Sequence, residues 1–520
     1  MTAQRVYLST TIPYVNARPH LGHALELVQA DVLARHHRLA GDQVRFQTGT
    51  DDNSLKNVLA AEAEGVAVTE LVGRYAAAFA ALREPLALSF DDFIRTSSDP
   101  RHRPGVERLW RACADRGDLY PKHYKGLYCV GCEQFYRPAE LRDGLCPEHL
   151  TQPQLVAEEN WFFRLSRYAG QLHDLVSSGR LRIEPAARRN EVLGIITGGL
   201  DDFSASRSTA RARGWGVPVP GDPGQVVYVW WDALGNYVTA LGYGTGDAGD
   251  YRRWWTGAGR RVHLLGKDVL RFHAIYWPAI LLSAGEPLPT DILVHDYLTA
   301  GGRKISKSGP AGDRADPAEL AARYGTDAVR WWLLREVPRQ GETDFTPARL
   351  VARANDDLAN DLGNLVSRVV TLVHRYRQGK VPRAGATAGE PARPGPDARA
   401  LAQARDQIPQ RTAAGLADFD FRAATTAIWE VVEEANRYVE RTAPWRLARA
   451  ERDGDAAAGE RLDESLALLV STCAQLGREL APFLPGLAAR IQAACDDSAG
   501  PLPAAEPVFP RLEPAGVTAA

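Results

Sequence analysis

Two short motifs of the chain combine residue types that suit phosphate chemistry. Near the start, two histidines flank a leucine and a glycine in Pro19-His20-Leu21-Gly22-His23. About 280 residues later, the segment Lys304-Ile305-Ser306-Lys307-Ser308 places two lysines beside two serines. Each motif arises by chance in unrelated proteins, and a Lys/Ser-rich pentapeptide is a common surface loop. Occurring together and in this order, they predict a nucleotide site.

The segment around the histidines predicts a helix start. Val6–Thr10 alternates like a strand, 13–19 interrupts it with prolines, and apolar residues then recur at helical spacing (Leu21, Leu25, Val28, Val32). A helix start offers backbone N–H groups and a positive dipole end, and Gly22 lets a flat purine approach closely. We expect His20 and His23 to lie at an ATP site. A plain helix end, or a metal held by two histidines three residues apart, is an alternative from these residues alone.

The lysines are informative about function because the chain has so few of them. Of 62 basic residues only seven are lysine (Lys56, Lys122, Lys125, Lys267, Lys304, Lys307, Lys380). Three of the seven lie in Gly266-Lys267-Asp268 and in the pentapeptide. A compact ammonium on a flexible stem follows a phosphoryl group through its transition state, a task for which the arginine fork is a poor substitute.

The spacing of four soft ligands predicts a metal knuckle. Cys129 and Cys132 are separated by two residues, as are Cys146 and His149, with thirteen residues between the two pairs. This pattern favours a structural zinc ion, because four protein ligands leave no open position for catalysis. Disulfides, or a metal lost during evolution, are the alternatives. The remaining cysteines have no partner pattern and are expected to be buried apolar residues (Cys113, Cys473, Cys495).

The order of predicted elements indicates an α/β fold. We expect a doubly wound, Rossmann-like parallel sheet with a zinc-knuckle insertion, followed by an all-α helical bundle. Apolar runs at 225–230 and 262–265 are predicted to be buried strands of that sheet. The predicted divisions are a first catalytic half, an insertion, a second half, a segment with the lysine motif, a helical bundle and a mobile tail (1–115, 116–222, 223–300, 301–354, 355–496, 497–520).

The composition limits the class of protein but does not identify it. With 45% apolar and 24% charged residues, the sequence is typical of a globular protein. Because it contains neither a signal peptide nor an apolar run of about 18 residues, we expect it to be cytoplasmic. A net charge of −2 gives no general attraction to nucleic acid, so any RNA contact must come from local arginine patches, for instance at Arg252, Arg253, Arg260 and Arg261.

Several separated blocks resemble the methionyl-tRNA synthetase family of the class I aminoacyl-tRNA synthetases. Besides the two opening motifs, the blocks are Thr11-Ile12-Pro13-Tyr14, Thr48-Gly49-Thr50-Asp51, Tyr228-Val229-Trp230-Trp231-Asp232-Ala233, Gly266-Lys267-Asp268, Phe272-His273 and Ala443-Pro444-Trp445. The match extends from about residue 5 to about residue 450. The resemblance implies an enzyme that uses ATP and Mg²⁺ to activate L-methionine and then transfers it to tRNA(Met), with structural Zn²⁺ in the knuckle. It implies no separate domain for hydrolysing mischarged tRNA.

The resemblance also assigns roles to individual residues. His20, His23, Lys304 and Lys307 match catalytic positions, and the ATP-binding positions are Gly22, Arg207, Asp232, Lys267, Asp268, Ser306 and Ser308. The methionine pocket corresponds to Ile12, Tyr14, Asp51, Trp230, Ala233, Leu234, Tyr237, Val269 and His273. The anticodon-reading positions correspond to Asn364, Arg368 and Trp445, and the metal ligands to Cys129, Cys132, Cys146 and His149.

These residue types suit their implied tasks. A carboxylate at Asp51 suits an α-ammonium, aromatic walls suit a polarizable thioether, and Tyr237 offers a hydroxyl toward sulfur. An asparagine and an arginine four residues apart share one helix face, and a tryptophan provides a stacking platform for a base. The alternative for Trp445 is that Pro444 starts a helix from which the indole packs inward.

The chain also departs from the family pattern. After Asp51 the family usually continues with an acid, His and Gly, whereas this chain has Asp52-Asn53-Ser54; Gly309-Pro310-Ala311-Gly312 replaces a Leu-Gly-Asn continuation, and Ile305 replaces a methionine. Met1 is the only methionine of 520 residues. One alternative is that Leu and Ile simply fill the cores; coding bias lowers the expected number of methionines but hardly to zero. The sharper hypothesis is a second, divergent member of the family, a reserve enzyme made when methionyl-tRNA is scarce and able to evade an inhibitor of the principal form.

Two other functions stay open at this point. One is an adenylating paralog with a non-tRNA acceptor, which would have no need for Asn364, Arg368 and Trp445. The other is a non-catalytic tRNA-binding paralog, which would have no need for the histidine and lysine motifs. We expect a monomer, because no appended dimerisation module is visible after the bundle.

Overall fold

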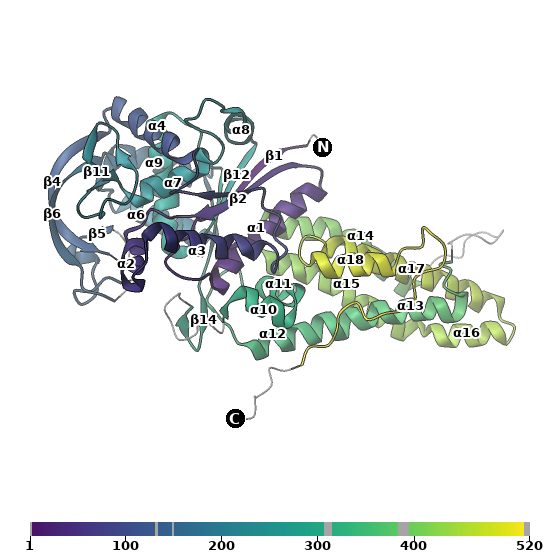
Figure 1. Cartoon of the computed structure of the whole chain (residues 1–520). Helices are drawn as coiled ribbons and strands as arrows, with labels where there is room; N and C mark the ends of the chain where they lie inside the picture. The colour runs from purple at the N-terminus through teal and green to yellow at the C-terminus, as the bar shows by residue number, and fades with distance from the viewer. Residues whose placement is uncertain (1–2, 131–133, 148–149, 306–314, 383–394, 514–520) are drawn as a thin grey trace, which may run out of the picture. The chain divides into compact units, whose positions relative to one another are not determined.

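The computed structural model describes residues 3–130, 134–147, 150–305, 315–382 and 395–513. The chain forms two compact units, which are described separately (Figure 1). Unit 1 comprises 1–84, 88–297 and 306–313, and unit 2 comprises 85–87, 298–305 and 314–520.

A six-stranded parallel sheet forms the centre of unit 1. Its order is β3-β2-β1-β12-β13-β7, with bounds Asp92–Arg95, Gln43–Thr50, Arg5–Thr10, Arg260–Gly266, Asp291–His295 and Arg182–Glu184. In register, Ser9 of β1 pairs with Gln47 of β2 on one side and with His263 of β12 on the other. Because the chain proceeds in opposite directions from β1 and from β12, the crevice at their carboxyl ends is the usual ligand position in such sheets. This confirms the predicted doubly wound α/β fold.

Helices connect the strands of unit 1. They are α1 (Leu21–Leu39), α2 (Leu55–Glu64), α3 (Val68–Ala80), α4 (His102–Asp115), α5 (Ala169–Ser177), α6 (Ala186–Thr197), α7 (Val229–Thr239), α8 (Gly249–Tyr251) and α9 (Trp277–Ala284). Short 3₁₀ turns are η1 (Ala81–Arg83), η2 (Pro138–Glu140), η3 (Leu165–Tyr168) and η5 (Lys267–Val269). Two π-helical stretches are η4 (Arg252–Thr256) and η6 (Phe272–Tyr276).

The insertion between β3 and β12 is mainly antiparallel. One sheet has the order β5-β4-β6-β8 (Gln134–Tyr136, Leu119–Cys129, Gln154–Phe163, Phe203–Ser204). Another has the order β10-β11-β9 (Pro218–Val219, Asp222–Val227, Ser206–Ser208). The predicted parallel strand at 225–230 is therefore wrong: β11 is antiparallel, and helix α7 begins at Val229. Residues 225–227 do form a strand, but it belongs to the antiparallel sheet, and the apolar run continues into the buried start of α7, so that it imitates one strand buried on two faces.

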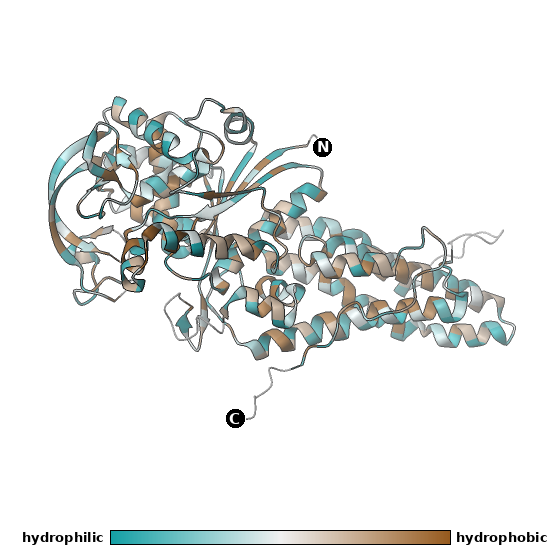
Figure 2. Ribbon diagram, in the orientation of Figure 1, coloured by the Kyte–Doolittle hydropathy of each residue, from teal (hydrophilic) through white to brown (hydrophobic). Residues whose placement is uncertain are grey.

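Unit 2 combines a small sheet with a helical bundle. The sheet order is β15-β14-β16 (Arg303–Lys304, Leu298–Ala300, Thr343–Asp344). The helices are α10 (Pro317–Tyr324), α11 (Thr326–Arg335), α12 (Pro347–Arg353), the π-helical η8 (Ala354–Gly363), α13 (Asn364–Arg377), α14 (Pro396–Ala417), α15 (Phe421–Thr442), α16 (Pro444–Arg452), α17 (Ala456–Leu480) and α18 (Pro485–Ala494). Apolar and polar positions alternate along these helices as expected for a bundle (Figure 2).

The C-terminal segment follows helix α13 instead of forming the predicted mobile tail. Leu502 N–H donates to the Gly379 carbonyl at 2.8 Å, and the Ser367 hydroxyl donates to the Glu506 carbonyl at 3.3 Å. Further on, the Asn355 side chain forms two bonds of 2.7 and 2.8 Å with the backbone of Leu512. Pro and Ala content suggested mobility, but side-chain bonds to the segment's backbone fix it as far as 513. The rest of the predicted tail lies outside the described residues.

The core contains no methionine side chain among the described residues, because the only methionine is Met1. Leucine, isoleucine, valine and aromatic residues fill it instead, and Ile305, which replaces the family's motif methionine, is 2% exposed. Over the described part of the chain, no single helix has the length and apolar character to cross a membrane; only the bent pair 55–64 and 68–83 meets both criteria when its helices are taken together.

Candidate active site

Two histidine rings close the start of helix α1. His20 is the N-cap, and its Nδ1 accepts a bond from Gly22 N–H at 3.1 Å. In return, His23 Nδ1 accepts from His20 N–H at 3.0 Å, and the two rings stack with centroids 3.8 Å apart. Because both Nδ1 atoms act as acceptors, the neutral rings carry their protons on Nε2. The predicted helix start is confirmed. The rings themselves accept the hydrogen bonds of the His20 and Gly22 N–H groups, which we expected a ligand to accept.

Gly22 is required by this cap. A Cβ atom at position 22 would lie 2.9 Å from Cε1 and 3.0 Å from Nδ1 of the His20 ring. A side chain there would displace the ring from the helix. Glycine thus permits the stacked pair, in addition to the close purine approach predicted from the sequence.

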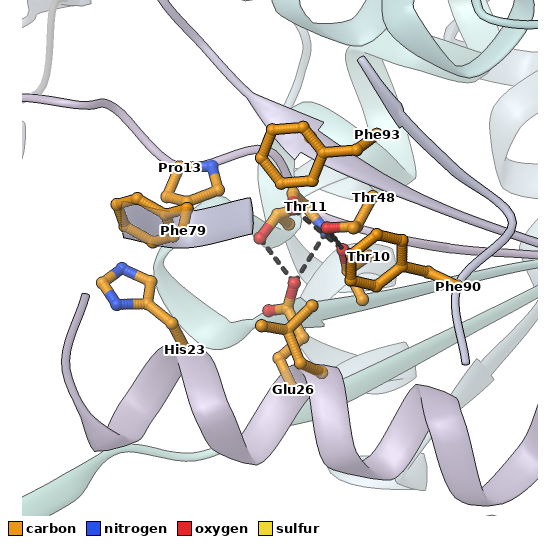
Figure 3. Close-up of a pocket in the computed structure, with 11 residues that line it drawn as sticks. Thr10, Thr11, Pro13, His23, Glu26, Thr48, Phe79, Phe90 and Phe93 are labelled. Atoms are coloured by element: carbon orange, nitrogen blue, oxygen red, sulfur yellow. Dashed lines mark hydrogen bonds between the residues drawn. The ribbon is translucent and has the colours of Figure 1, made fainter. Parts of the chain in front are cut away.

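A buried carboxylate, Glu26, lies one turn further along α1. It accepts bonds of 2.6 Å from both N–H and Oγ1 of Thr11, and it lines a small cavity with His23, Thr48 and three phenylalanines (Figure 3). Its other oxygen lies 3.1 Å from Nε2 of His295, at the end of β13. Burial by itself would lower the pKa of His295, but the bond and charge of Glu26 raise it above the ordinary value. Glu26 thereby joins α1 to the carboxyl ends of β1 and β13.

The loop after β2 carries Asp51, the residue predicted to bind the α-ammonium of methionine. Asp51 is 1% exposed and pairs with Tyr14 in an isolated parallel bridge. Its Oδ1 accepts from Asn53 N–H at 3.1 Å. Before it, Gly49 allows β2 to pass β3, because a Cβ there would lie 2.2 Å from the Ile94 carbonyl oxygen. The structure brings the Tyr14 and Asp51 blocks together.

Aromatic side chains form a continuous wall beside Asp51. Trp230 meets Tyr14 edge-on at 6.2 Å and stacks on Phe272 at 3.9 Å. Trp230 also meets His273 edge-on at 6.3 Å. The remaining predicted pocket residues pack in the same region: Ile12 with Ala233 in one cluster, and Leu234, Tyr237 and Val269 in another that includes Tyr14 and Trp230. The nine residues of the predicted methionine pocket thus lie in unit 1 as one connected group.

Hydrogen bonds fix the proton positions of His273 and Tyr237. His273 Nδ1 donates to the Val269 carbonyl at 2.9 Å, so Nε2 of the neutral ring accepts the Tyr237 O–H at 2.8 Å. Burial lowers the pKa of His273 to about 4 and raises that of Tyr237 well above its ordinary value. The Tyr237 proton therefore points to His273, whereas the sequence suggested that it would be offered to sulfur.

The residues predicted to hold ATP divide into two groups. Lys267 and Asp268 lie on η5, directly after β12, with the Lys267 ammonium 4.2 Å from the centre of the Tyr297 ring. Asp268 is exposed at this carboxyl edge, as expected for a ribose contact. Lys304 lies on β15 of unit 2 and is exposed. Ser306, Lys307 and Ser308 lie outside the described residues.

Two residues predicted to bind ATP are bonded within the protein. Asp232 is 1% exposed, with Oδ1 2.7 Å from Nε2 of His102 and Oδ2 accepting from Asn53 Nδ2 at 2.7 Å. Arg207 is 6% exposed in the insertion, where its guanidinium donates to Ser206 and Ser204 oxygens and lies 4.1 Å from the Tyr228 ring centre. The strand-like sequence next to Asp232 and Arg207 gave no sign of these partners, because a sequence does not show which buried polar groups contact each other.

The arginine patch suggested for RNA is partly structural. Arg261 donates to three backbone carbonyls (Trp255, Ala258, Leu288), and Arg260 pairs with Asp291 at 3.0 Å. These two side chains stabilise the region around β12. The expectation of a four-arginine RNA surface is therefore wrong for Arg260 and Arg261.

The knuckle is described in part. Cys129 and Cys146 are 2% and 0% exposed and belong to one small buried cluster with Tyr136. Cys132 and His149 lie outside the described residues, and within the described ones no group of three metal-binding side chains occurs. The two described thiols have the donor chemistry and proximity that fit a zinc site. The three cysteines outside the knuckle are buried, as predicted (Cys113, Cys473, Cys495).

In unit 2, the three predicted anticodon-reading residues lie toward solvent. Asn364 begins α13 and is exposed, and Arg368, four residues later on the same face, pairs with Glu440 of α15 at 2.6 Å. Pro444 starts α16, as the alternative predicted, but Trp445 is 41% exposed instead of packing inward. An exposed indole is available as a stacking platform.

Sequence reasoning missed four residues of this site: Glu26, Asn53, His102 and Phe272. Glu26 gives no signal, since it lies away from the apolar stripe of Leu21, Leu25 and Val28, on a side of the helix where an acid is usually exposed to solvent. Phe272 precedes His273 in a block that resembles the family, but the resemblance assigned a role only to His273. Asn53 belongs to the segment after Asp51 that departs from the family pattern, but its bond to Asp232, like that of His102, gave no signal because Asp232 is distant in sequence.

The chain is similar to known proteins along nearly its whole length. The family profile described as "tRNA synthetases class I (M)" matches residues 6–154 and 137–370. A methionine–tRNA ligase of Brucella suis is 39% identical over 98% of both chains, and one of Mycobacterium bovis is 41% identical over 87% of this chain and 85% of its own. The structure of Mycobacterium tuberculosis methionyl-tRNA synthetase in complex with methionyl-adenylate superposes with a TM-score of 0.89 at 37% identity, covering 98% of this chain and 100% of that one.

Proposed function

Since the chain belongs to the methionine–tRNA ligases of the class I tRNA synthetases, we infer that it joins L-methionine to tRNA(Met) at the expense of ATP. In the first step, a carboxylate oxygen of methionine bonds to the α-phosphorus of ATP and pyrophosphate leaves. In the second, a hydroxyl of the 3′-terminal adenosine takes the methionyl group and AMP leaves. The observation that carries this inference is the junction of the Tyr14–Asp51 bridge with the Trp230–His273 wall, beside the sheet edge where such folds bind ligands.

For methionine, we assign the ammonium to Asp51 and the thioether to the aromatic wall. A carboxylate that is 1% exposed gives a strong charge-assisted bond to an ammonium. Trp230, Tyr14 and Phe272 contribute ring faces and edges, which favour sulfur. Tyr237 and the neutral His273 complete this wall with their polar atoms bonded to each other.

For ATP, we assign the triphosphate to His20 and His23, whose Nε2–H groups are donors next to a helix N-terminus. Asp268 is assigned to the ribose and Gly22 to the purine approach. Lys304 and Lys307, supported by Lys267, Ser306 and Ser308, supply positive charge and hydroxyl donors to the transferring phosphate. Mg²⁺ arrives with ATP and neutralises its phosphate charge. For Arg207 and Asp232, whose bonds are internal, we assign positioning roles instead.

For tRNA, we assign the CAU anticodon to Asn364, Arg368 and Trp445. Exposure of the indole and of the amide suits unstacked bases, which bring both a ring face and hydrogen-bonding edges. Zn²⁺ is assigned to Cys129, Cys132, Cys146 and His149, where it would stabilise the knuckle without taking part in the chemistry. A cytoplasmic monomer, with the domain boundaries given above apart from the mobile tail, is the arrangement we propose for the working enzyme.

The test is amino-acid-dependent exchange of pyrophosphate into ATP, run with each amino acid and followed by aminoacylation of purified tRNA. Exchange with methionine and charging of tRNA(Met) are the expected outcomes. Exchange without charging would favour an adenylating paralog with another acceptor, and tRNA binding without exchange would favour a non-catalytic paralog. Elemental analysis of the same preparation should give about one zinc per chain; an active preparation without zinc would remove the metal assignment.

A further inference from the structure

The segment that departs from the family pattern is bonded to both sides of the methionine pocket. Asn53 stands in this segment, directly between Asp51 and helix α2, and is half-buried. Its backbone N–H donates to Asp51 Oδ1 at 3.1 Å, and its side-chain Nδ2 donates to Asp232 Oδ2 at 2.7 Å. One residue therefore contacts the carboxylate of the ammonium site and a carboxylate of α7.

Asp232 is a rigid anchor for this bond. It lies in the first turn of α7, is 1% exposed, and has its other oxygen 2.7 Å from Nε2 of His102. His102 is itself fully buried, with Nδ1 2.8 Å from Thr239 Oγ1 on the same helix α7. A buried carboxylate held from two sides has little freedom to move, so the bond to Asn53 fixes the loop.

Helix α7 also carries the pocket wall. Trp230, Ala233 and Tyr237 belong to it, and Asp232 lies among them in sequence. A bond from Asn53 to Asp232 therefore ties the position of the Asp51 carboxylate to the position of the aromatic wall. Methionine has to meet both at once, with its ammonium on one and its side chain on the other.

Asp52 and Ser54 hold the ends of the same segment. Asp52 accepts from Thr50 Oγ1 at 2.8 Å and Ser97 Oγ at 2.6 Å and pairs with Arg95 at 3.0 Å, while Ser54 caps α2. These bonds fix the backbone on either side but leave the Asp51 side chain to its own partners. The direct link from the loop to α7 is made by Asn53.

We propose that Asn53 is a positioning residue for methionine recognition, which orients the Asp51 carboxylate toward the substrate ammonium and holds it at a fixed distance from α7. This rests on the proposed ammonium role of Asp51. The Asn53 side chain acts through Asp232, which fixes the backbone N–H that donates to Asp51, and it has no direct part in the chemistry.

The test compares two competitive inhibitors of methionine-dependent pyrophosphate exchange that differ only in the ammonium: methioninol and 4-(methylthio)butan-1-ol. The ratio of their inhibition constants reports recognition of the ammonium alone. Asn53→Ala removes the link, and Asn53→Asp keeps the size but replaces the donor with an acceptor. Asn190→Ala, an exposed asparagine of α6, is the matched control, and thermal unfolding of each variant checks the fold.

We expect both Asn53 variants to reduce this ratio by about 10-fold, as for loss of a bond to a charged group, with the ATP KM unchanged within twofold and with Asn190→Ala equal to wild type. An unchanged ratio, or equal weakening of both inhibitors, would overturn the proposal. Asp51→Asn separates this result from the function itself. If Asp51→Asn abolishes the preference while the Asn53 variants keep it, only the role of Asn53 fails; if Asp51→Asn also keeps it, the assignment of the ammonium fails, and the positioning role with it.

Discussion

The two predicted recognition regions of this protein are built in opposite ways. In unit 1, the residues assigned to methionine are buried or partly buried, and several are bonded within the site, as in the Tyr237–His273 pair and the Asp51–Asn53 contact. In unit 2, Asn364 and Trp445, assigned to the anticodon, are exposed, with Trp445 41% accessible, and Arg368 is half-buried. The protein itself organises the small-molecule site, whereas the tRNA site presents groups that its ligand has to cover. Preorganisation suits selection among small substrates, and exposed platforms suit a ligand that brings its own structure.

The largest effect should come from breaking the preorganised site at its charge. We expect Asp51→Asn to lower kcat/KM for methionine in pyrophosphate exchange by about 100-fold, because an ammonium loses a buried charge-assisted partner. The ATP KM should stay within about threefold. Asp174→Asn, whose side chain is 75% exposed, is the control. A loss that falls equally on ATP and methionine would mean that Asp51 supports the fold and not the ammonium.

A smaller effect is expected from the exposed site. Trp445→Ala should reduce aminoacylation of tRNA(Met) by about 30-fold, since stacking of one base contributes about 1–3 kcal/mol. Pyrophosphate exchange without tRNA should not change, because no anticodon takes part in it. If exchange falls as well, the comparison between the two regions is wrong, and Trp445 has a role in the stability of the bundle.

A substitution in the lysine motif distinguishes stabilisation of the transition state from binding at the two recognition sites. We expect Lys307→Arg to slow adenylate formation by about 10-fold, on the order of 1.4 kcal/mol, with little change in methionine binding. The guanidinium keeps the charge but loses the compact, rotatable ammonium. Single-turnover rates and equilibrium binding of methionine measure the two quantities. Equal losses in both would indicate that the motif supports the pocket.

The smallest expected effect is that of pH on the pocket. Burial lowers the pKa of His273 to about 4, so the ring stays neutral and the methionine KM should vary less than twofold between pH 6 and 8. An unfolded chain, with a histidine pKa of about 6.5, takes up a proton that the folded pocket refuses. The free energy of unfolding should therefore fall as pH decreases from about 6.5 to about 4, by about 3 kcal/mol from this group. A several-fold rise in KM below pH 7 would contradict the neutral ring.

Local signals predicted strand β1 and the start of helix α1 correctly. Prolines before His20 and helical spacing after it identified the α1 start, and strand-like alternation identified β1. These features depend on neighbours in the chain, which a sequence displays directly. The doubly wound fold followed from the order of such elements.

Contacts between distant residues were beyond the same reasoning. The apolar run at 225–230 did not reveal that it joins the antiparallel strand β11 to the buried helix α7, and nothing near Asp232 revealed His102 or Asn53 as its partners. Pro and Ala content after 496 suggested mobility, although bonds from Asn355 and Ser367 hold that segment. In each case the deciding partner lies far along the chain.

The absence of methionine from the interior has a practical consequence for spectroscopy of the enzyme. Apart from Met1, no residue of the chain contributes a thioether methyl group. Magnetic resonance of the protein with methionine labelled at its methyl carbon would therefore show the substrate against almost no background. The signal would move as the thioether meets the ring faces of Trp230 and Tyr14, whose ring currents shift nearby methyl protons. Binding, adenylate formation and release could then be followed on the substrate itself, without altering a single side chain of the protein.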